Sequence, residues 1–202
     1  MSLLSTREFW EKIFEFRDGH DWYYGSDTSA EYVKKYLPIS NIEFPYILHC
    51  GCGASTLIGS ISKIISNYGY CIHFDIVESV IHRMKQNINY PNENFLLADG
   101  RHLPFVSSSF NIILEKGLFD SLTADSSIQN VNATTLLSEY VRLLQYEGKV
   151  IIFSIFGPNA EEKDMFGLLS HPSLSVQVVS IPIPPAEIPS QNFGFIYILS
   201  LI

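Results

Sequence analysis

The sequence predicts an α/β fold built on a mostly parallel β-sheet. Strand-like and helix-like segments alternate over residues 46–156, a pattern typical of parallel strands joined by helices. Within this region the stretch 47–55, ILHCGCGAS, leaves a predicted strand and enters a predicted helix through two glycines. Two strand-like runs at 174–183 and 193–202 have no helix signal between them, which indicates an antiparallel closing pair.

Two helices are predicted before the first strand. Each begins with a capping box, in which a serine or threonine is followed three residues later by a glutamate. The first box pairs Ser5 with Glu8, and the second pairs Thr28 with Glu31. Between the helices, the segment 17–27, RDGHDWYYGSD, carries two glycines and a cluster of aromatic residues, and we expect it to be a loop.

The alternation starts with a strand over 46–50, YILHC. Apolar residues at helical spacing then predict a helix from Leu57 to Ile65. The next segments are predicted, in turn, as a strand, a helix and two strands, at 70–76, 77–88, 94–99 and 110–117.

A further helix is predicted from apolar positions between Leu136 and Leu144, with Gly148 as its stop. A fifth core strand follows at 149–156. The closing pair comes last, and a proline-rich segment joins its two strands.

Composition indicates one globular domain. Apolar residues make up 47% and charged residues 17% of the 202 residues. A chain of this length and composition can bury a core without disulfides or metal ions to stabilise it. The formal net charge of −8 argues against nucleic acid as a partner, because affinity for phosphates comes from clustered lysine and arginine. A basic or lysine-presenting protein is the better expectation. No apolar run is long enough for a membrane span or a signal peptide, so we expect a cytoplasmic protein without a membrane partner.

The glycine stretch holds two of the three cysteines. Cys50 and Cys52 lie too close together in an extended segment for a structural disulfide. A zinc site needs about four ligands, and beyond His49 the sequence has no second Cys/His pair at ligand spacing. We therefore expect reduced thiols and no metal. Cys71 lies within a predicted strand and is expected in the core.

The position of the glycine stretch favours a cofactor pocket, because α/β sheets bind nucleotide-type ligands where a strand gives way to a helix. Asp75 ends the next predicted strand, where a carboxylate can accept both hydroxyls of a ribose. Asp99 ends the following strand, where its carboxylate or the neighbouring backbone can reach the exocyclic amine of an adenine. Each aspartate could also be an ordinary turn residue. Thr56 stands where a dinucleotide fingerprint has its third glycine, which disfavours a nicotinamide or flavin cofactor.

These residues and their flanking motifs resemble those of the class I S-adenosylmethionine-dependent methyltransferases. The resemblance is closest to the methyltransferase-like group that contains lysine methyltransferases of translation elongation factor 1-alpha. That group has FDVVLEKGTLDALL where this chain has FNIILEKGLFDSLT, and LGCGNS where this chain has CGCGAS. Its Tyr-Trp-Asp-x-x-Tyr and Glu/Asp-Trp-Tyr/Phe motifs match FWEKIF and DWYYG. Phe14 and Ala54 depart from these motifs, in place of a tyrosine and an asparagine.

The resemblance implies a fold and a cofactor. The fold is a Rossmann-like sheet of seven strands, mostly parallel with an antiparallel last strand, with helices on both faces. Residues 1–40 would form an N-terminal helical lid, and residues 41–202 the core of a single methyltransferase domain. The cofactor is S-adenosylmethionine, and the resemblance and the glycine stretch give as its candidate contacts Trp10, Trp22, Gly51, Cys52, Gly53, Asp75, Ile76, Asp99, Gly100, Glu115 and Lys116.

Glu115 and Lys116 end the fourth predicted strand, at the same edge of the sheet as the glycine stretch. We expect Glu115 to orient the cofactor's ammonium or the incoming amine, and Lys116 to reach the carboxylate of the methionyl group. The alternative is an ordinary surface ion pair. A lysine acceptor is charged at its ordinary pKa of about 10.4, so it must lose a proton by burial or to a carboxylate. Glu115 and Asp120 are the candidate catalytic residues.

Aromatic residues are expected to close over the cofactor, because aromatic faces attract a sulfonium or an ammonium. The candidates are Trp10, Trp22, Tyr23 and Tyr24; alternatively, they pack the N-terminal helices on the sheet. Methylation of a protein lysine, for which an open acidic groove is expected, is the first hypothesis. Methylation of a small molecule in a closed pocket, and a module that binds the cofactor without catalysis, remain open.

Overall fold

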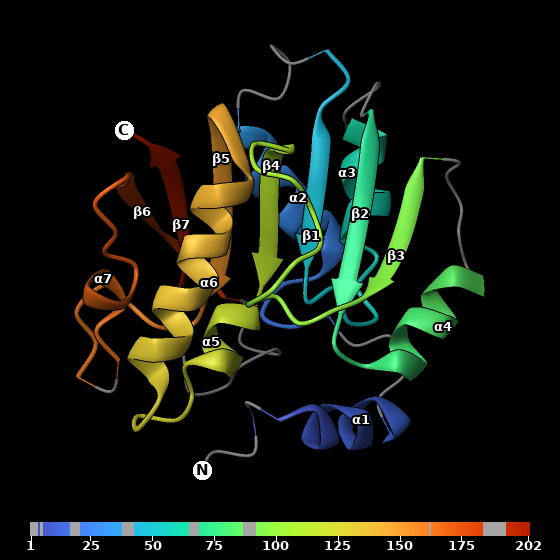
Figure 1. Cartoon of the computed structure of the whole chain (residues 1–202), viewed down its shortest axis with the longest axis horizontal. Helices are drawn as coiled ribbons and strands as arrows, with labels where there is room; N and C mark the ends of the chain where they lie inside the picture. The colour runs from blue at the N-terminus through green and yellow to red at the C-terminus, as the bar shows by residue number, and fades with distance from the viewer. Residues whose placement is uncertain are drawn as a thin grey trace.

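In the described part of the chain, seven strands form one sheet (Figure 1). The computed structural model describes residues 4, 6–16, 21–37, 43–64, 69–86, 92–161, 163–183 and 193–202. The strands are β1 (Tyr46–Cys50), β2 (Tyr70–Asp75), β3 (Glu93–Leu97), β4 (Phe110–Lys116), β5 (Leu144–Ser154), β6 (Leu174–Pro182) and β7 (Phe193–Leu201). Their order across the sheet is β3-β2-β1-β4-β5-β7-β6.

The sheet is mostly parallel with one antiparallel strand, as the sequence predicts. Strands β1 to β5 pair in parallel, whereas β7 runs antiparallel to both β5 and β6. From β1 the chain continues through β2 and β3 toward one edge, and then returns to β4 on the other side of β1. Ligands bind at such a reversal in α/β sheets, outside the carboxyl ends of the strands.

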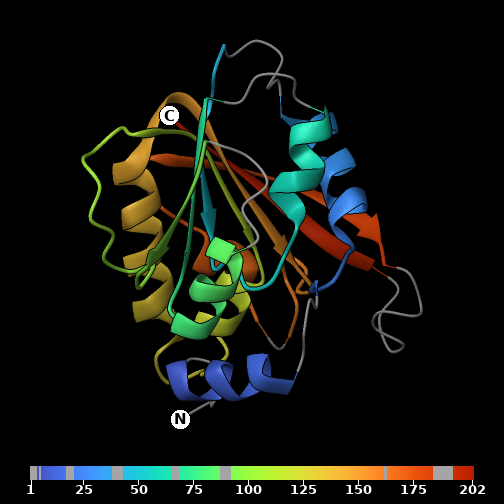
Figure 2. The same cartoon turned by 90° about the vertical axis from the view of Figure 1, so that its right-hand side faces the viewer.

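The helices cover both faces of the sheet. They are α1 (Arg7–Phe16), α2 (Ser26–Tyr36), α3 (Leu57–Ile64), α4 (Glu78–Gln86), α5 (Leu118–Leu122), α6 (Gln129–Leu143) and α7 (Met165–Leu168). Figure 2 shows α2 and α3 on one face and α6 on the other. Helix α1 lies beyond the carboxyl ends of the parallel strands (Figure 1). None of the described helices is long and apolar enough to cross a membrane.

Two apolar clusters fix this arrangement. On one face, Leu136, Leu137 and Tyr140 of α6 are buried against β4 and β5. On the other face, the apolar stripe of α3, which includes Leu57 and Ile61, packs with α2 against the same sheet. Because both faces are covered, β4 is buried along nearly its whole length, which explains the apolar run from Ile112 to Leu114 at its centre.

The structure corrects one helix start. Helix α2 begins at Ser26 after Gly25, so the capping box predicted at Thr28 is wrong. The Ser26 hydroxyl donates to Asp21 and accepts from the Thr56 hydroxyl at 3.0 Å; these contacts from outside the helix accompany the earlier start. Ser5 lies outside the described residues, and in α1 it is the Thr6 hydroxyl that accepts from the Phe9 amide at 3.4 Å.

The end of α6 also differs from the prediction. The helix ends at Leu143, and Leu144 already pairs with Phe110 in the sheet. Gly148 therefore lies in β5 and does not stop the helix. A Cβ atom at this glycine would lie 2.8 Å from the Asn111 carbonyl oxygen, so glycine allows a close approach of two strands. The proline-rich segment 184–192 and residues 17–20 of the predicted loop lie outside the described residues.

Candidate active site

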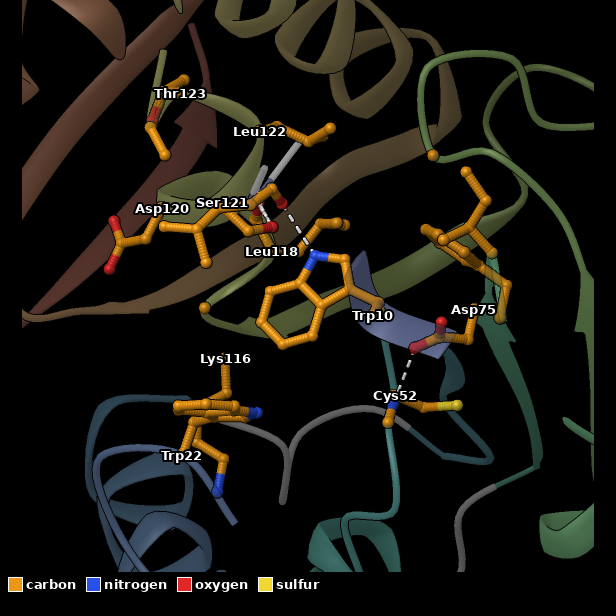
Figure 3. A pocket seen from close by; sticks show the side chains of 18 of the residues that line it. Trp10, Trp22, Cys52, Asp75, Lys116, Leu118, Asp120, Ser121, Leu122 and Thr123 are labelled. Atoms are coloured by element: carbon orange, nitrogen blue, oxygen red, sulfur yellow. Dashed lines mark hydrogen bonds between the residues drawn. The ribbon is translucent and has the colours of Figure 1, made fainter. Parts of the chain in front are cut away.

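A cavity of about 520 Å³ opens at the carboxyl ends of β1, β2 and β4, within the size range of small-ligand pockets. Figure 3 shows side chains from α1, the loop before α2, α5 and the strand ends facing it. It brings together nearly all of the predicted site residues: Trp10, Trp22, Gly51, Cys52, Gly53, Asp75, Ile76, Asp99, Gly100, Lys116 and Asp120.

The loop after β1 forms one wall, and its two glycines are required by geometry. Gly51 and Gly53 have φ angles of 55° and 51°, in the left-handed region that glycine adopts without strain. A Cβ atom would lie 3.1 Å from Leu118 at the first position and 3.1 Å from the Phe14 ring at the second. The bare backbone therefore lets Leu118 and Phe14 pack directly against this wall, where a larger residue would collide with them.

Asp75 supports this loop from the end of β2. Its side-chain oxygens accept the backbone N–H of Gly53 at 2.9 Å and that of Val77 at 3.0 Å. Burial raises the pKa of the Asp75 carboxyl, and the backbone donors oppose that rise. A carboxylate offers about four acceptor positions, so these bonds and the backbone donor of Ile76 still leave acceptor capacity for a ligand hydroxyl.

Asp99 forms a forked ion pair at the end of β3. Arg101 Nη2 lies 2.6 Å from one carboxylate oxygen of Asp99, and Nε lies 3.0 Å from the other. Despite partial burial, which raises it, the pKa of Asp99 is held below its usual value by these bonds. Since Arg101 uses both oxygens, the geometry favours the neighbouring backbone over the carboxylate for contact with an adenine. Arg101 was not predicted as a site residue, although it lies only two residues from Asp99.

Lys116 anchors the aromatic loop, which lies before α2 and carries Trp22, Tyr23 and Tyr24. Its ammonium is buried and donates to Asp21 Oδ1 at 2.9 Å and to the Tyr24 carbonyl oxygen at 2.7 Å. Burial raises the pKa of Asp21, but Lys116 and nearby hydroxyl donors bring it below its ordinary value. Lys116 thus holds the loop in place, in addition to its predicted contact with a ligand carboxylate.

Two tryptophans form the aromatic side of the cavity. The rings of Trp10 and Trp22 meet edge to face, with centroids 5.6 Å apart. The indole N–H of Trp10 donates to the Leu4 carbonyl oxygen at 2.7 Å. The Trp10 ring also contacts Phe14, which packs beside Ala54. The two residues that depart from the family motifs therefore meet in one apolar cluster.

Asp120 lies at the far end of the cavity, where three donors converge on its carboxylate. The Tyr23 hydroxyl donates at 2.9 Å, the Ser154 hydroxyl at 2.8 Å and the Ile155 backbone N–H at 3.2 Å. Burial raises the pKa of Asp120, and Lys163 opposes the rise. Three bonds leave about one of the four acceptor positions of the carboxylate.

Lys163 was not predicted from the sequence, yet it lines the same end of the cavity. Its ammonium donates to the Thr123 hydroxyl at 3.0 Å and to the Asp120 carbonyl oxygen at 3.2 Å. It also lies 4.1 Å from the centroid of the Phe156 ring, a cation–π contact. Burial lowers the pKa of Lys163, and Asp120 opposes this effect.

Glu115 does not line the cavity, which argues against its predicted roles. Its side chain is fully buried on the α6 side of the sheet, where Oε2 accepts from the Phe119 backbone N–H at 2.9 Å and from the Tyr140 hydroxyl at 3.1 Å. Among the described residues, Oε1 has no hydrogen-bond partner. Adjacent side chains of a strand point to opposite faces, and of these two residues it is Lys116 that lines the cavity.

The histidine beside the glycine loop is buried next to another histidine. The Nδ1 atoms of His49 and His73 lie 3.1 Å apart. Burial, helped by the Lys116 charge, lowers the pKa of His49 to about 3, so the ring is neutral at pH 7. Cys50 and Cys71 are buried core residues, as expected for Cys71. In the part of the chain that the structure describes, no group of three potential metal ligands occurs.

Comparison with known proteins identifies the family. The sequence profile described as "Methyltransferase domain" matches residues 48–152, which is more than half of the 202-residue chain. The chain belongs to the methyltransferase domain family. The matched residues run from β1 to β5 and include the glycine loop, Asp75, Asp99 and Asp120 of this methyltransferase domain.

Curated relatives are considerably longer than the chain. The human protein named "eEF1A lysine and N-terminal methyltransferase" is 31% identical over 175 residues, which cover 77% of this chain and 23% of that protein. The mouse protein of the same name is 30% identical over 161 residues, which cover 74% of this chain and 21% of that protein. The chain thus spans about a fifth of the length of these relatives.

Solved structures with this fold are also methyltransferases. The N-methyltransferase NodS from Bradyrhizobium japonicum, in complex with S-adenosyl-L-homocysteine, aligns with a TM-score of 0.70 over 97% of this chain and 98% of that chain, at 14% identity. A methyltransferase from Methanosarcina mazei aligns with a TM-score of 0.64 over 82% of this chain and 98% of that chain, at 16% identity. These similarities confirm the predicted class I methyltransferase fold.

Proposed function

We propose that the protein is an S-adenosylmethionine-dependent methyltransferase that modifies a lysine of another protein. One observation carries the cofactor assignment: the Gly51–Gly53 wall and the Asp75 carboxylate meet at the reversal point of a methyltransferase-domain sheet. The bare backbone and the remaining acceptor capacity of Asp75 fit a ligand that carries a ribose.

The residues that would hold the cofactor divide by chemistry. Asp75 would accept the ribose hydroxyls, with Ile76 beside it. The backbone at Asp99 and Gly100 would face the adenine, and Lys116 the methionyl carboxylate. Trp10 and Trp22 would cover the ligand and exclude water, as expected if residues 1–40 act as a lid. When bound, S-adenosylmethionine supplies a sulfonium-activated methyl group, so the chain itself has chiefly to bind, orient and desolvate the reactants.

The acceptor class rests on the relatives. Proteins about 30% identical to this chain are named as lysine and N-terminal methyltransferases of eEF1A, and the net charge of −8 suits a lysine-presenting partner. The acceptor amine must be neutral. The aromatic and apolar lining would favour the neutral form by desolvation, and Asp120 is the predicted catalytic carboxylate that lines the cavity.

One observation favours a second candidate, a methyltransferase that acts on a small molecule. A groove rich in unpaired carboxylates is what a cationic protein segment would require. Here Asp21 pairs with Lys116, Asp99 with Arg101, and Lys163 lies close to Asp120. These lining charges therefore nearly balance one another, which suits an uncharged small acceptor equally well.

Calorimetric titration tests the cofactor, and isotope transfer tests the acceptor. We expect S-adenosylmethionine to bind the wild type with micromolar affinity, and Asp75→Ala to lose at least about 100-fold in affinity. Glu31→Ala removes an exposed carboxylate on α2 and should bind as the wild type does. Absence of wild-type binding would refute the assignment. With methyl-labelled cofactor and a cell extract, label in eEF1A supports the protein substrate, and label confined to the small-molecule fraction supports the alternative.

A further inference from the structure

A hydrogen bond joins two cavity walls that are distant in the sequence. The Tyr23 hydroxyl donates to Asp120 Oδ2 at 2.9 Å, across a separation of 97 residues. Tyr23 belongs to the loop between α1 and α2, and Asp120 belongs to α5. The bond therefore ties the N-terminal aromatic loop to the end of the cavity that holds Lys163.

The backbone at Tyr23 is in an unfavourable conformation. Its φ angle is 66°, in the left-handed region that bulky residues rarely adopt. The Tyr24 backbone N–H donates to the Trp22 carbonyl oxygen at 2.7 Å, which makes Tyr23 the centre of a three-residue γ-turn of the rarer, strained kind. Such a conformation persists only where surrounding contacts fix it, and it is common in binding sites.

The surrounding structure supplies these contacts on both sides of the turn. Lys116 binds Asp21 before the turn and the Tyr24 carbonyl oxygen after it. Gly117, with a φ angle of 90°, allows the tyrosine to approach, because a Cβ atom there would lie 3.3 Å from the Tyr23 hydroxyl. The turn directs Trp22 toward the cavity and against Trp10 (Figure 3).

We propose that Asp120 is a positioning residue, which holds Trp22 against the cavity by anchoring the strained turn through the Tyr23 hydroxyl. This role is separate from any proton transfer by the same carboxylate. Without the bond the turn relaxes, and the fraction of molecules with Trp22 in place falls. Apparent affinity falls in proportion to that fraction. This proposal rests on the proposed function only in naming S-adenosylmethionine as the ligand.

Tyr23→Phe tests this inference because it removes a single oxygen atom. The chain has two tryptophans, both of which line the cavity, so two indole N–H signals in a ¹H–¹⁵N spectrum report on the site directly. We expect the Trp22 signal to broaden or shift in the unliganded variant, and the Kd for S-adenosylmethionine to rise about tenfold. An unchanged Trp22 signal, with affinity within twofold of the wild type, would overturn the proposal.

Ser154→Ala is the matched control. It removes another donor to the same carboxylate, together with the acceptor of the Phe156 backbone N–H, and neither contact involves the loop before α2. The Trp22 signal and the Kd should stay close to those of the wild type. If this variant matches Tyr23→Phe in both measurements, Asp120 has only a general structural role and the proposal is overturned. If the wild type does not bind S-adenosylmethionine, the proposed function fails, and the Trp22 signal alone decides the positioning role.

Discussion

The two sides of the cavity are built in different ways. On the side of β1 and β2, Asp75 bonds to Gly53 and Val77, which are 22 and 2 residues away. On the side of β4 and β5, Asp120 is bound by Tyr23 from 97 residues away, and Lys163 is 43 residues from the carbonyl that it binds. The first side is specified within one β-α-β unit, whereas the second depends on the whole topology.

The charges of the two sides follow the same division. Asp75 is stabilised by backbone donors, without an ion-pair partner among the described residues. Asp120 is surrounded by side-chain hydroxyls and has a lysine nearby. We infer that the cofactor binds on the first side of the cavity and that the second side selects the methyl acceptor. Substitutions on the two sides should then separate cofactor binding from turnover, except at Tyr23 and Asp120, whose hydrogen bond we propose positions Trp22.

The largest effect is expected on the β1 side, from Gly53→Val. A β-branched residue would be forced to a φ angle of 51° and against the Phe14 ring. We expect S-adenosylmethionine affinity to fall on the order of 100-fold or more, as measured by calorimetry. Gly25→Ala is the control, because nothing lies within 4 Å of the added Cβ. Wild-type affinity in Gly53→Val would show that the bare loop is not needed.

On the β5 side, Lys163→Met should affect turnover more than cofactor binding. The variant keeps an unbranched, slightly shorter side chain but removes the positive charge near Asp120 and its bonds to Thr123 and the Asp120 carbonyl. We expect kcat to fall about tenfold, with the Kd for S-adenosylmethionine within twofold of the wild type. Lys85→Met, on the exposed face of α4, controls for loss of a lysine. Equal losses in kcat and cofactor affinity would contradict the division of the cavity.

The smallest effect concerns stability, in Glu115→Gln. Burial, followed by the Asp120 charge, raises the pKa of Glu115 well above its ordinary value. The folded state therefore binds this proton more tightly than the unfolded state, and wild-type stability is lost as pH rises from below about 4.5 through the folded-state pKa. Glutamine has no proton to lose, so we expect the variant to gain about 1 kcal/mol over the wild type between pH 5 and pH 8.

Urea unfolding at several pH values measures this difference. Glu31→Gln, at an exposed position of α2, should follow the wild-type pH dependence. If the free energy of unfolding of Glu115→Gln varied with pH in parallel with that of the wild type, Glu115 would ionise in the folded protein without an energetic penalty. The predicted effect of its burial on stability would then be wrong.

Much of the fold and of the cofactor side could be predicted because their signals are local. The spacing of Leu57, Ile58 and Ile61 predicts α3, and the glycines between β1 and α3 predict the bare loop. Asp75 ends a buried strand and was expected at the cavity for that reason. The Thr28 capping box failed because contacts from Asp21 and Thr56 place the helix start at Ser26, and a local pattern carries no such information.

Glu115 and Lys116 show a limit of prediction from the sequence. Glu115 and Lys116 were assigned together to the ligand, yet the alternation of a strand places them on opposite faces. Which face is open to the cavity depends on what covers each one, and α6 covers the face of Glu115. Lys163 had no pattern around it, because Asp120 and Thr123 become its neighbours only after folding. Arg101 lies only two residues from its partner Asp99, and this short spacing is the one local signal for it.

The sequence by itself determined the α/β class, the succession of strands and helices along the chain, the glycine loop and the carboxylate that supports it. These features depend on periodicity and on contacts within one β-α-β unit. Only the tertiary structure decided the Asp120 end of the cavity. There, Tyr23, Asp120, Ser154 and Lys163 come from four separate segments, and their hydrogen bonds and charges exist only where the packed sheet brings those segments together.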